Sequence, residues 1–181
     1  MKGKYHICSG GRHTPRKGIQ DLIVAMSMLD SRIDYQLRIF GEGPLTSYYK
    51  ELIGHFGLES SIQLVGFVEN IMAELQNADL FVLPSHSEGF GIVLLEAMNA
   101  GCKLVASDCD YGPREILNYG EFGTLVQPKN PYELAAGIEE EIRTPRDIGE
   151  FENMLKKFDI RSQCEKYLEL IEDSTRNQES Q

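Results

Sequence analysis

The chain has no excess of basic residues. Its 181 residues include 18 Lys and Arg against 28 Asp and Glu, which gives a formal net charge of −10 at pH 7. Proteins that bind nucleic acid generally need a basic excess, because they displace counterions from the phosphate backbone. The composition therefore argues against nucleic-acid binding. Any anion site must be built locally, from a few cations and backbone N–H groups.

Paired cysteines, a secretory signal and long hydrophobic runs are also absent from the sequence. The four cysteines form neither a C-x-x-C pair nor a zinc-ligand spacing. No apolar stretch approaches the roughly 18 residues typical of a transmembrane helix. We expect Cys8 and Cys102 to be small buried hydrophobic residues of a cytoplasmic protein in a reducing compartment. Peripheral attachment to the inner face of a membrane stays open.

The sequence alternates short apolar runs with segments of helical period. Continuous apolar side chains are typical of parallel strands that are covered on both faces. The strand candidates are residues 5–9, 35–40, 62–65, 80–83, 103–106 and 124–126. Six β–α units in succession predict an α/β fold, with a doubly wound, parallel six-stranded Rossmann-like sheet.

Helical periodicity marks the segments between these strands. Apolar stripes are expected around Ile19–Leu29, Leu45–Phe56 and Leu134–Ile142, and a last helix is expected from Ile160 to Ile171. Asn130-Pro131 is typical of an N-cap followed by proline at the first helical position. We expect one domain over residues 1–172 and a frayed polar tail over residues 173–181.

The expected topology brings two unusual loops together. If the strand order is 3-2-1-4-5-6, the first and fourth strands are neighbours where the winding reverses. Ligands of such folds bind there, beyond the carboxyl ends of the strands. The loops that follow these two strands are residues 10–17 and 85–91, and they hold His13 and His86 as further candidate ligand contacts. We therefore predict that the two loops face one another.

The first loop, Gly10-Gly-Arg-His-Thr-Pro-Arg-Lys-Gly18, is rich in glycine and cations. Arg12 can hold a phosphate with two parallel hydrogen bonds, and Lys17 supplies a compact charge. The loop is not a Walker motif, since Gly18 stands where Ser or Thr is required. Arg16 is expected to face solvent. The alternative is that the whole loop is a solvated turn.

The second loop leads into Glu88-Gly-Phe-Gly-Ile-Val-Leu-Leu-Glu96. Gly89 and Gly91 allow a tight turn and close approach of backbone to a ligand. The helix from about Ile92 is hydrophobic nearly all round and is expected to be buried. A carboxylate in it needs a donor, and ligand hydroxyl groups are candidates. The alternatives are a solvated Glu88 and a structural Glu96 bound to a backbone group or a lysine.

Other sequence patterns give weaker functional predictions than these two loops. Asp108-Cys-Asp110 matches a D-x-D pattern, but two carboxylates are too few for a specific metal site, so no metal is expected. Gly41-Glu-Gly-Pro44 begins like a dinucleotide fingerprint, yet it follows the wrong strand. A glycosidase needs two opposed carboxyl groups across a cleft, whereas Glu88 and Glu96 share one loop and helix.

Several of these motifs together resemble the retaining glycosyltransferases of family 4. In chain order they are Gly11-Arg12 with Lys17-Gly18, Gly41-Glu-Gly-Pro44, Gly66-Phe67, Leu83-Pro84-Ser85, Glu88-x7-Glu96 and Gly112-Pro113-x-Glu115. The resemblance covers roughly residues 5–143. It corresponds to the C-terminal, nucleotide-sugar-binding half of a GT-B enzyme.

The resemblance implies roles for these residues. Arg12 and Lys17 would hold the donor diphosphate and stabilise charge on the leaving nucleotide, with Glu88 beside the donor sugar as the third catalytic residue. Glu96 would accept hydrogen bonds from the ribose. The implied donor-binding residues are Gly11, Arg12, Lys17, Gly66, Phe67, Val68, Glu88, Phe90, Gly91, Ile92 and Glu96. The family needs no divalent metal or other cofactor, and it transfers sugar with retention.

The resemblance also implies partners. The donor would be a nucleotide sugar, with UDP-sugars favoured by the segment Asp108–Glu115, and the acceptor a glycan or lipid-linked glycan, as in polysaccharide or lipopolysaccharide assembly. Because the chain begins at the first strand of this half, we expect a longer protein or a partner chain to supply the acceptor domain. The isolated chain would then transfer sugar slowly or not at all. The alternative is a non-catalytic nucleotide-sugar-binding or partner-binding subunit.

Overall fold

The computed structural model describes residues 3–145, 149 and 151–158 of the chain. The chain divides into two compact units, residues 1–148 and 149–181. The second unit contributes one described helix, α7 (Phe151–Lys157). The last helix and the tail expected from the sequence lie outside the described residues. None of the helices in the described part of the chain has the length and apolar character that a bilayer crossing requires.

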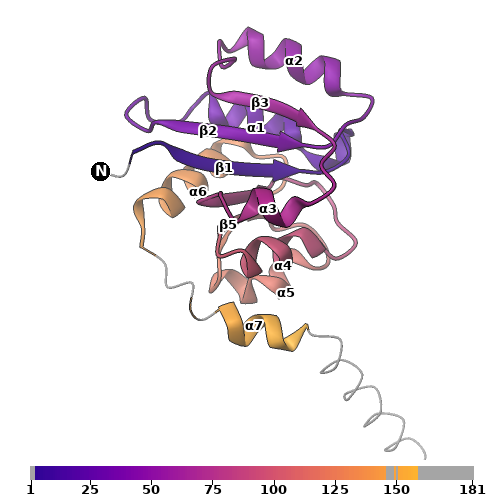
Figure 1. Ribbon diagram of the computed structural model, residues 1–181, viewed down its shortest axis with the longest axis vertical. Helices are drawn as coiled ribbons and strands as arrows, with labels where there is room; N and C mark the ends of the chain where they lie inside the picture. Colours follow the sequence, from indigo (N-terminus) through magenta and orange to yellow (C-terminus); the bar gives the residue numbers. More distant parts are fainter. Residues whose placement is uncertain (1–2, 146–148, 150, 159–181) are drawn as a thin grey trace, which may run out of the picture. The chain divides into compact units, whose positions relative to one another are not determined.

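The first unit is built on one six-stranded sheet, shown in Figure 1. Its strands are β1 (Tyr5–Gly10), β2 (Tyr35–Phe40), β3 (Ile62–Gly66), β4 (Leu80–Leu83), β5 (Lys103–Ser107) and β6 (Thr124–Val126). They lie in the order β3-β2-β1-β4-β5-β6, and neighbouring strands pair in parallel. The predicted doubly wound sheet, its strand order and the neighbouring positions of the first and fourth strands are confirmed.

Helices connect the strands. They are α1 (Ile19–Met26), α2 (Thr46–His55), α3 (Ile71–Leu75), α4 (Ile92–Asn99), α5 (Pro113–Ile116) and α6 (Pro131–Arg143), with short 3-10 turns η1 (Pro15–Lys17) and η2 (Asn118–Gly120). The predicted start of α6 is confirmed, because the Asn130 side chain accepts a hydrogen bond from the Glu133 N–H. The missing N–H of Pro131 costs nothing at this first helical position.

The core explains why the strands are apolar throughout. In β4 every side chain is at most 1% exposed. Leu80 and Val82 pack in the cluster that contains Ile23 of α1 and Ile138 of α6. Phe81 points to the other face of the sheet, because side chains alternate along a strand. The helix α4 packs against β4 and β5. A parallel strand covered on both faces has no solvated side, and its sequence therefore shows no alternation.

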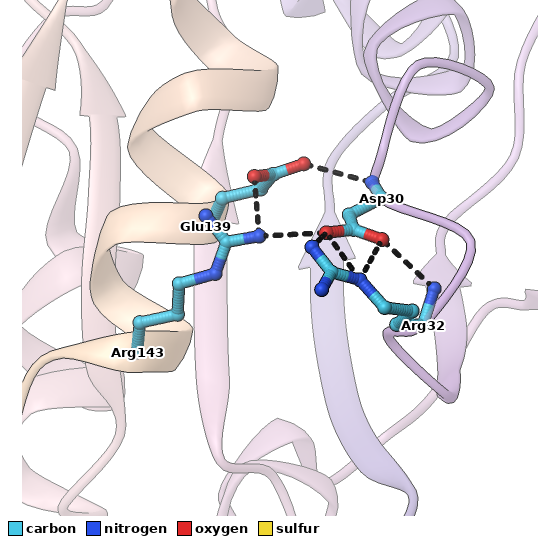
Figure 2. A network of polar contacts seen from close by, with 4 residues as sticks. All are labelled: Asp30, Arg32, Glu139 and Arg143. Carbon is cyan, nitrogen blue, oxygen red and sulfur yellow. Dashed lines mark hydrogen bonds and ion pairs between the residues drawn. The ribbon is translucent and has the colours of Figure 1, made fainter.

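A charged network fastens the turn after α1 to α6 (Figure 2). The Asp30 carboxylate accepts hydrogen bonds from Arg32 Nε, at 3.0 Å, and from Arg143, at 3.1 Å. Glu139 accepts the backbone N–H of Asp30, at 2.8 Å, and pairs with Arg143 at 2.9 Å. Because Asp30 precedes β2, this network lies at the amino ends of the strands. The network therefore lies at the end of the sheet opposite to the carboxyl ends of the strands, where the candidate site is found.

Candidate functional site

A cleft of about 850 Å³ opens beyond the carboxyl ends of β1, β2, β3 and β4. It is lined by Gly10, Gly11, Arg12, Lys17, Phe40, Gly41, Glu42, Phe67, Val68, Ile71, Glu88, Phe90, Gly91, Ile92 and Val93. A second cavity, of about 650 Å³, lies at the opposite end of the sheet beside the Asp30 network. Its arginines, Arg32 and Arg143, are already bound to Asp30, so we take the first cleft as the candidate site.

The loops after β1 and β4 are in backbone contact. Gly18 has a φ of 64°, and a Cβ at this position would lie 1.9 Å from the Pro84 carbonyl oxygen. Only glycine fits such an approach in the left-handed conformation. The His86 N–H also donates to the Arg16 carbonyl oxygen at 2.8 Å. The prediction that these two loops converge is confirmed.

The loop after β2 joins the same assembly, which the sequence did not reveal. A Cβ on Gly41, whose φ is 102°, would lie 2.2 Å from the Gly11 carbonyl oxygen. The His13 N–H donates to the Glu42 carbonyl oxygen at 3.0 Å, and Gly41 donates to Gly66 at 2.7 Å. The glycines of the Gly41-Glu-Gly-Pro44 motif thus let three loops pack backbone to backbone. The position of this motif after a parallel strand is the signal that would have placed Phe40 and Glu42 in the cleft.

Lys17 and Glu88 meet inside the cleft. Lys17 Nζ lies 2.6 Å from Glu88 Oε1, and the two side chains are only 18% and 7% exposed. The Ser85 hydroxyl donates to the same carboxylate oxygen at 2.5 Å. The alternatives of a solvated turn around Lys17 and a solvated Glu88 are therefore wrong, because the topology folds each side chain against the other. Ser85 was missed as a site residue, because the Leu83-Pro84-Ser85 motif to which it belongs gave no role for its hydroxyl.

Arg12 is the exposed cation of the cleft. It lines the cleft near Lys17, and its guanidinium has no hydrogen-bond or ion-pair partner among the described residues. Arg16, four positions along the loop, is exposed as predicted and is not among the cleft-lining residues. The donors of Arg12 are thus available to an anionic ligand, in the fork geometry that suits phosphate oxygens.

The helix α4 is less buried than the sequence predicts. Leu94, Ala97 and Met98 are buried, but Ile92 is 64% exposed. The prediction of a fully buried helix is wrong, because the first turn of α4 lies at the cleft mouth and only one face packs on the sheet. Glu96 is half-buried and is not among the cleft-lining residues, and its carboxylate has no side-chain partner among the residues described. Its acceptor sites are therefore unfilled by neighbouring protein groups.

Apolar side chains form the other half of the cleft. Phe67, which is 78% exposed, and Val68 follow β3, and Phe90 and Ile92 lie on the facing loop and helix. All of the donor-binding residues proposed from the sequence line the cleft except Gly66 and Glu96. The cleft therefore combines cationic and carboxylate groups with apolar side chains. Such a cleft suits a ligand with an anionic part and an aromatic part.

The remaining candidates have structural partners. Arg114 binds the Asp108 carboxylate through two contacts, one of 2.8 Å from Nε. Among the described residues, no group of three or more His, Cys, Asp or Glu could hold a metal ion. His86 pairs with Asp21 at 2.5 Å. His13 is fully buried, with Nδ1 2.8 Å from Thr46 Oγ1. Neither histidine is among the residues that line the cleft.

Comparison with known proteins identifies a family whose profile covers most of the chain. The profile of the family described as "Glycosyl transferases group 1" matches residues 1–159. An exopolysaccharide phosphotransferase of Streptomyces coelicolor is 40% identical over 129 residues, which cover 70% of this chain and 14% of that protein. The chain therefore spans only a small part of this relative.

Solved structures share the fold. The C-terminal domain of LpcC, a group 1 glycosyl transferase from Francisella tularensis, matches with a TM-score of 0.70 and 32% identity, over 77% of this chain and 76% of that one. S. aureus TarM, solved with fondaparinux, alpha-GlcNAc-glycerol and UDP, matches with a TM-score of 0.81 and 28% identity. The match covers 91% of this chain and 35% of TarM.

Proposed function

The chain belongs to the group 1 glycosyl transferases, and we propose that it is the donor-binding half of an enzyme that transfers a sugar from a UDP-sugar to an acceptor. The observation that carries this proposal is the cleft in which Arg12, Lys17 and Glu88 converge at the switch point of the sheet. Cations and a carboxylate side by side suit a ligand that bears both phosphate groups and hydroxyl groups. The UDP in the related TarM structure supports the choice of nucleotide.

Each part of the cleft has a task in this proposal. Arg12 and Lys17 bind the diphosphate and stabilise the charge that develops on it as the glycosidic bond breaks. Glu88 accepts a hydrogen bond from a sugar hydroxyl, and the apolar end around Phe67 takes the base. Glu96 does not line the cleft, and its role as acceptor of hydrogen bonds from the ribose is proposed from the family resemblance. A metal-independent reaction is proposed from the family resemblance, and the Arg12 guanidinium, which has no partner among the described residues, supports it.

We further propose the finer details that the family resemblance implies. Transfer proceeds with retention of configuration, as in family 4, and NMR of the product anomer tests this. The acceptor is a glycan or a lipid-linked glycan at the cytoplasmic face of a membrane, in keeping with the exopolysaccharide named for one relative. The acceptor-binding domain comes from a longer protein or a partner chain, since the chain spans 35% of TarM.

Calorimetry against UDP, GDP and a panel of UDP-sugars tests the donor site. We expect the chain to bind UDP at micromolar to millimolar strength, and Arg12→Ala to weaken this binding about tenfold, since a charged hydrogen bond contributes on the order of 1.5–3 kcal/mol. Arg16→Ala is the matched control, because Arg16 lies in the same loop outside the cleft lining. Equal affinities for the parent and for Arg12→Ala would remove Arg12 from the site.

A non-catalytic subunit that only binds nucleotide sugars would give the same binding results. This second candidate is supported by the fact that the chain covers only part of the length of its relatives. Turnover separates the two. A complete protein or partner complex that contains this chain should release UDP in step with acceptor glycosylation, and Lys17→Ala should slow the release. Donor binding without any turnover, across a panel of glycan acceptors, would favour the non-catalytic subunit.

A further inference from the structure

Ser85 is buried beside the cleft, and its hydroxyl contacts the carboxylate of Glu88. Its side chain is 0% exposed, at the carboxyl end of β4, and it is not among the residues that line the cleft. The hydroxyl donates to Glu88 Oε1 at 2.5 Å, a short distance typical of a hydrogen bond to a charged acceptor. Lys17 Nζ lies 2.6 Å from the same oxygen. Two donors from two different loops therefore converge on one atom.

We propose that Ser85 is a positioning residue, which together with Lys17 fixes Glu88 by one oxygen and presents the other to the donor sugar. A carboxylate has two oxygens with about four acceptor sites in total. Oε1 is occupied by Ser85 and Lys17, while Oε2 has no partner among the described residues. The oxygen that remains is the one that can accept a sugar hydroxyl. This inference rests on the proposed nucleotide-sugar site.

The two donors differ in how firmly they hold the carboxylate. Lys17 reaches Glu88 through a flexible four-carbon stem, and a phosphate that enters the cleft competes for its ammonium group. Ser85 has a short side chain in the buried start of the loop after β4, next to Pro84, whose carbonyl oxygen is packed against Gly18. When phosphate draws Lys17 away, the Ser85 hydrogen bond is the contact that keeps Glu88 in place. Ser85 should therefore affect recognition of the sugar and leave recognition of the nucleotide unchanged.

The neighbouring strand offers a matched control. Ser9 lies near the carboxyl end of β1, is also 0% exposed, and its hydroxyl has no hydrogen-bond partner in the described part of the chain. Ser9→Ala and Ser85→Ala remove the same atom from equally buried sites, one within β1 and the other two residues beyond the end of β4. Only the second removal takes a donor from Glu88. Ser85→Cys completes the set, because a thiol keeps the bulk of the side chain but is a weak donor.

The experiment measures affinity for UDP, for UDP-glucose and for UDP-N-acetylglucosamine by calorimetry on the full chain. The ratio between the UDP-sugar and UDP affinities reports the contribution of the sugar. We expect Ser85→Ala to lower this ratio about five- to tenfold for the preferred sugar, as for the loss of one hydrogen bond of about 1–1.5 kcal/mol. UDP affinity should stay within twofold. Ser85→Cys should show the same loss, and Ser9→Ala should match the parent.

The outcomes are distinguishable. If the parent binds UDP-sugar more tightly than UDP and Ser85→Ala keeps the whole difference, the positioning role is wrong. If Ser85→Cys behaves like the parent while Ser85→Ala does not, Ser85 acts by packing and the inference also fails. A parent that binds UDP and UDP-sugars equally well overturns the inference but leaves nucleotide binding intact. A parent that binds no nucleotide overturns the proposed function itself.

Discussion

Lys17 Nζ and Glu88 Oε1 lie 2.6 Å apart, although 71 positions separate the two residues in the chain. Each comes from a loop at the carboxyl end of a central strand, and both side chains are largely shielded from water. The charge of the lysine is therefore balanced by a carboxylate. Under the proposed function a diphosphate competes with Glu88 for this cation, and we therefore expect Glu88 and Glu96 to act in opposite directions on nucleotide binding.

Glu88→Gln should strengthen UDP binding. The substitution removes the charge that competes for Lys17 but keeps the size of the side chain, so we expect the dissociation constant for UDP to fall about three- to tenfold at low salt. The gain should shrink as salt screens the pair. Glu96→Gln is the comparison variant. The Glu96 carboxylate has no partner among the described residues, and we have proposed that it accepts hydrogen bonds from the ribose. This variant should weaken UDP binding. Calorimetry at two salt concentrations measures both effects, and a common sign for the two variants would contradict this account.

Gly18→Ala should destabilise the protein and damage the cleft. The new Cβ would lie 1.9 Å from the Pro84 carbonyl oxygen at a φ of 64°. Left-handed backbone with a side chain costs roughly 1–2 kcal/mol, and separating the loops adds to this. We expect urea unfolding to show a loss of about 2–4 kcal/mol, together with weaker UDP binding because Lys17 and Glu88 move apart.

Gly89→Ala is the matched control for this substitution. Gly89 belongs to the loop that carries Glu88, no heavy atom lies within 4 Å of its virtual Cβ, and its φ is not positive. Its substitution should change the free energy of unfolding by about 0.5 kcal/mol or less, as for other open surface positions. Similar losses for the two variants would mean that the contact with Pro84 is not what holds the loops together.

The sheet could be predicted from the sequence because its signal is local. A continuous apolar run such as Leu80–Leu83, short and ended by Pro84, favours a strand covered on both faces, and β-α alternation then leaves few topologies. Strand order in turn placed Lys17 and Glu88 in one cleft. The parts that could not be predicted depend on contacts between distant segments. The motifs that contain Ser85 and Gly41 are visible in the sequence, but the hydrogen bond of Ser85 and the packing of Gly41 on Gly11 are not.

The exposure of α4 illustrates a different limit. Its residues are hydrophobic nearly all round, and periodicity alone assigns such a helix to the interior. The exposed Ile92 lies at the mouth of the cleft, where apolar surface can serve a ligand instead of the core. Local rules fail most often at functional sites, where a residue is selected for a partner that the sequence does not contain.

Cys8 and Cys102 should resist alkylation in the folded protein. Burial raises the pKa of the Cys8 thiol to about 11 and that of the Cys102 thiol to about 12. The reactive thiolate is therefore scarce at pH 8. We expect iodoacetamide to label both residues only as fast as the protein unfolds, with complete labelling in urea, as measured by peptide mass spectrometry. Labelling of the native protein at the rate seen in urea would show that these strand and loop positions open locally.

His13 should make the protein less stable below neutral pH. Burial lowers the pKa of this imidazole from its ordinary value of 6.5, so the unfolded chain binds a proton more readily than the folded one. The contribution of His13 to the free energy of unfolding is complete above pH 6.5. It is lost as the pH falls towards the lower pKa of the folded state, by at most about 1.4 kcal/mol per pH unit. Urea unfolding between pH 7.5 and 5.5 measures the slope. His13→Asn should flatten this slope. If His13→Asn keeps the slope of the parent, then the buried ring is not what makes the fold sensitive to acid.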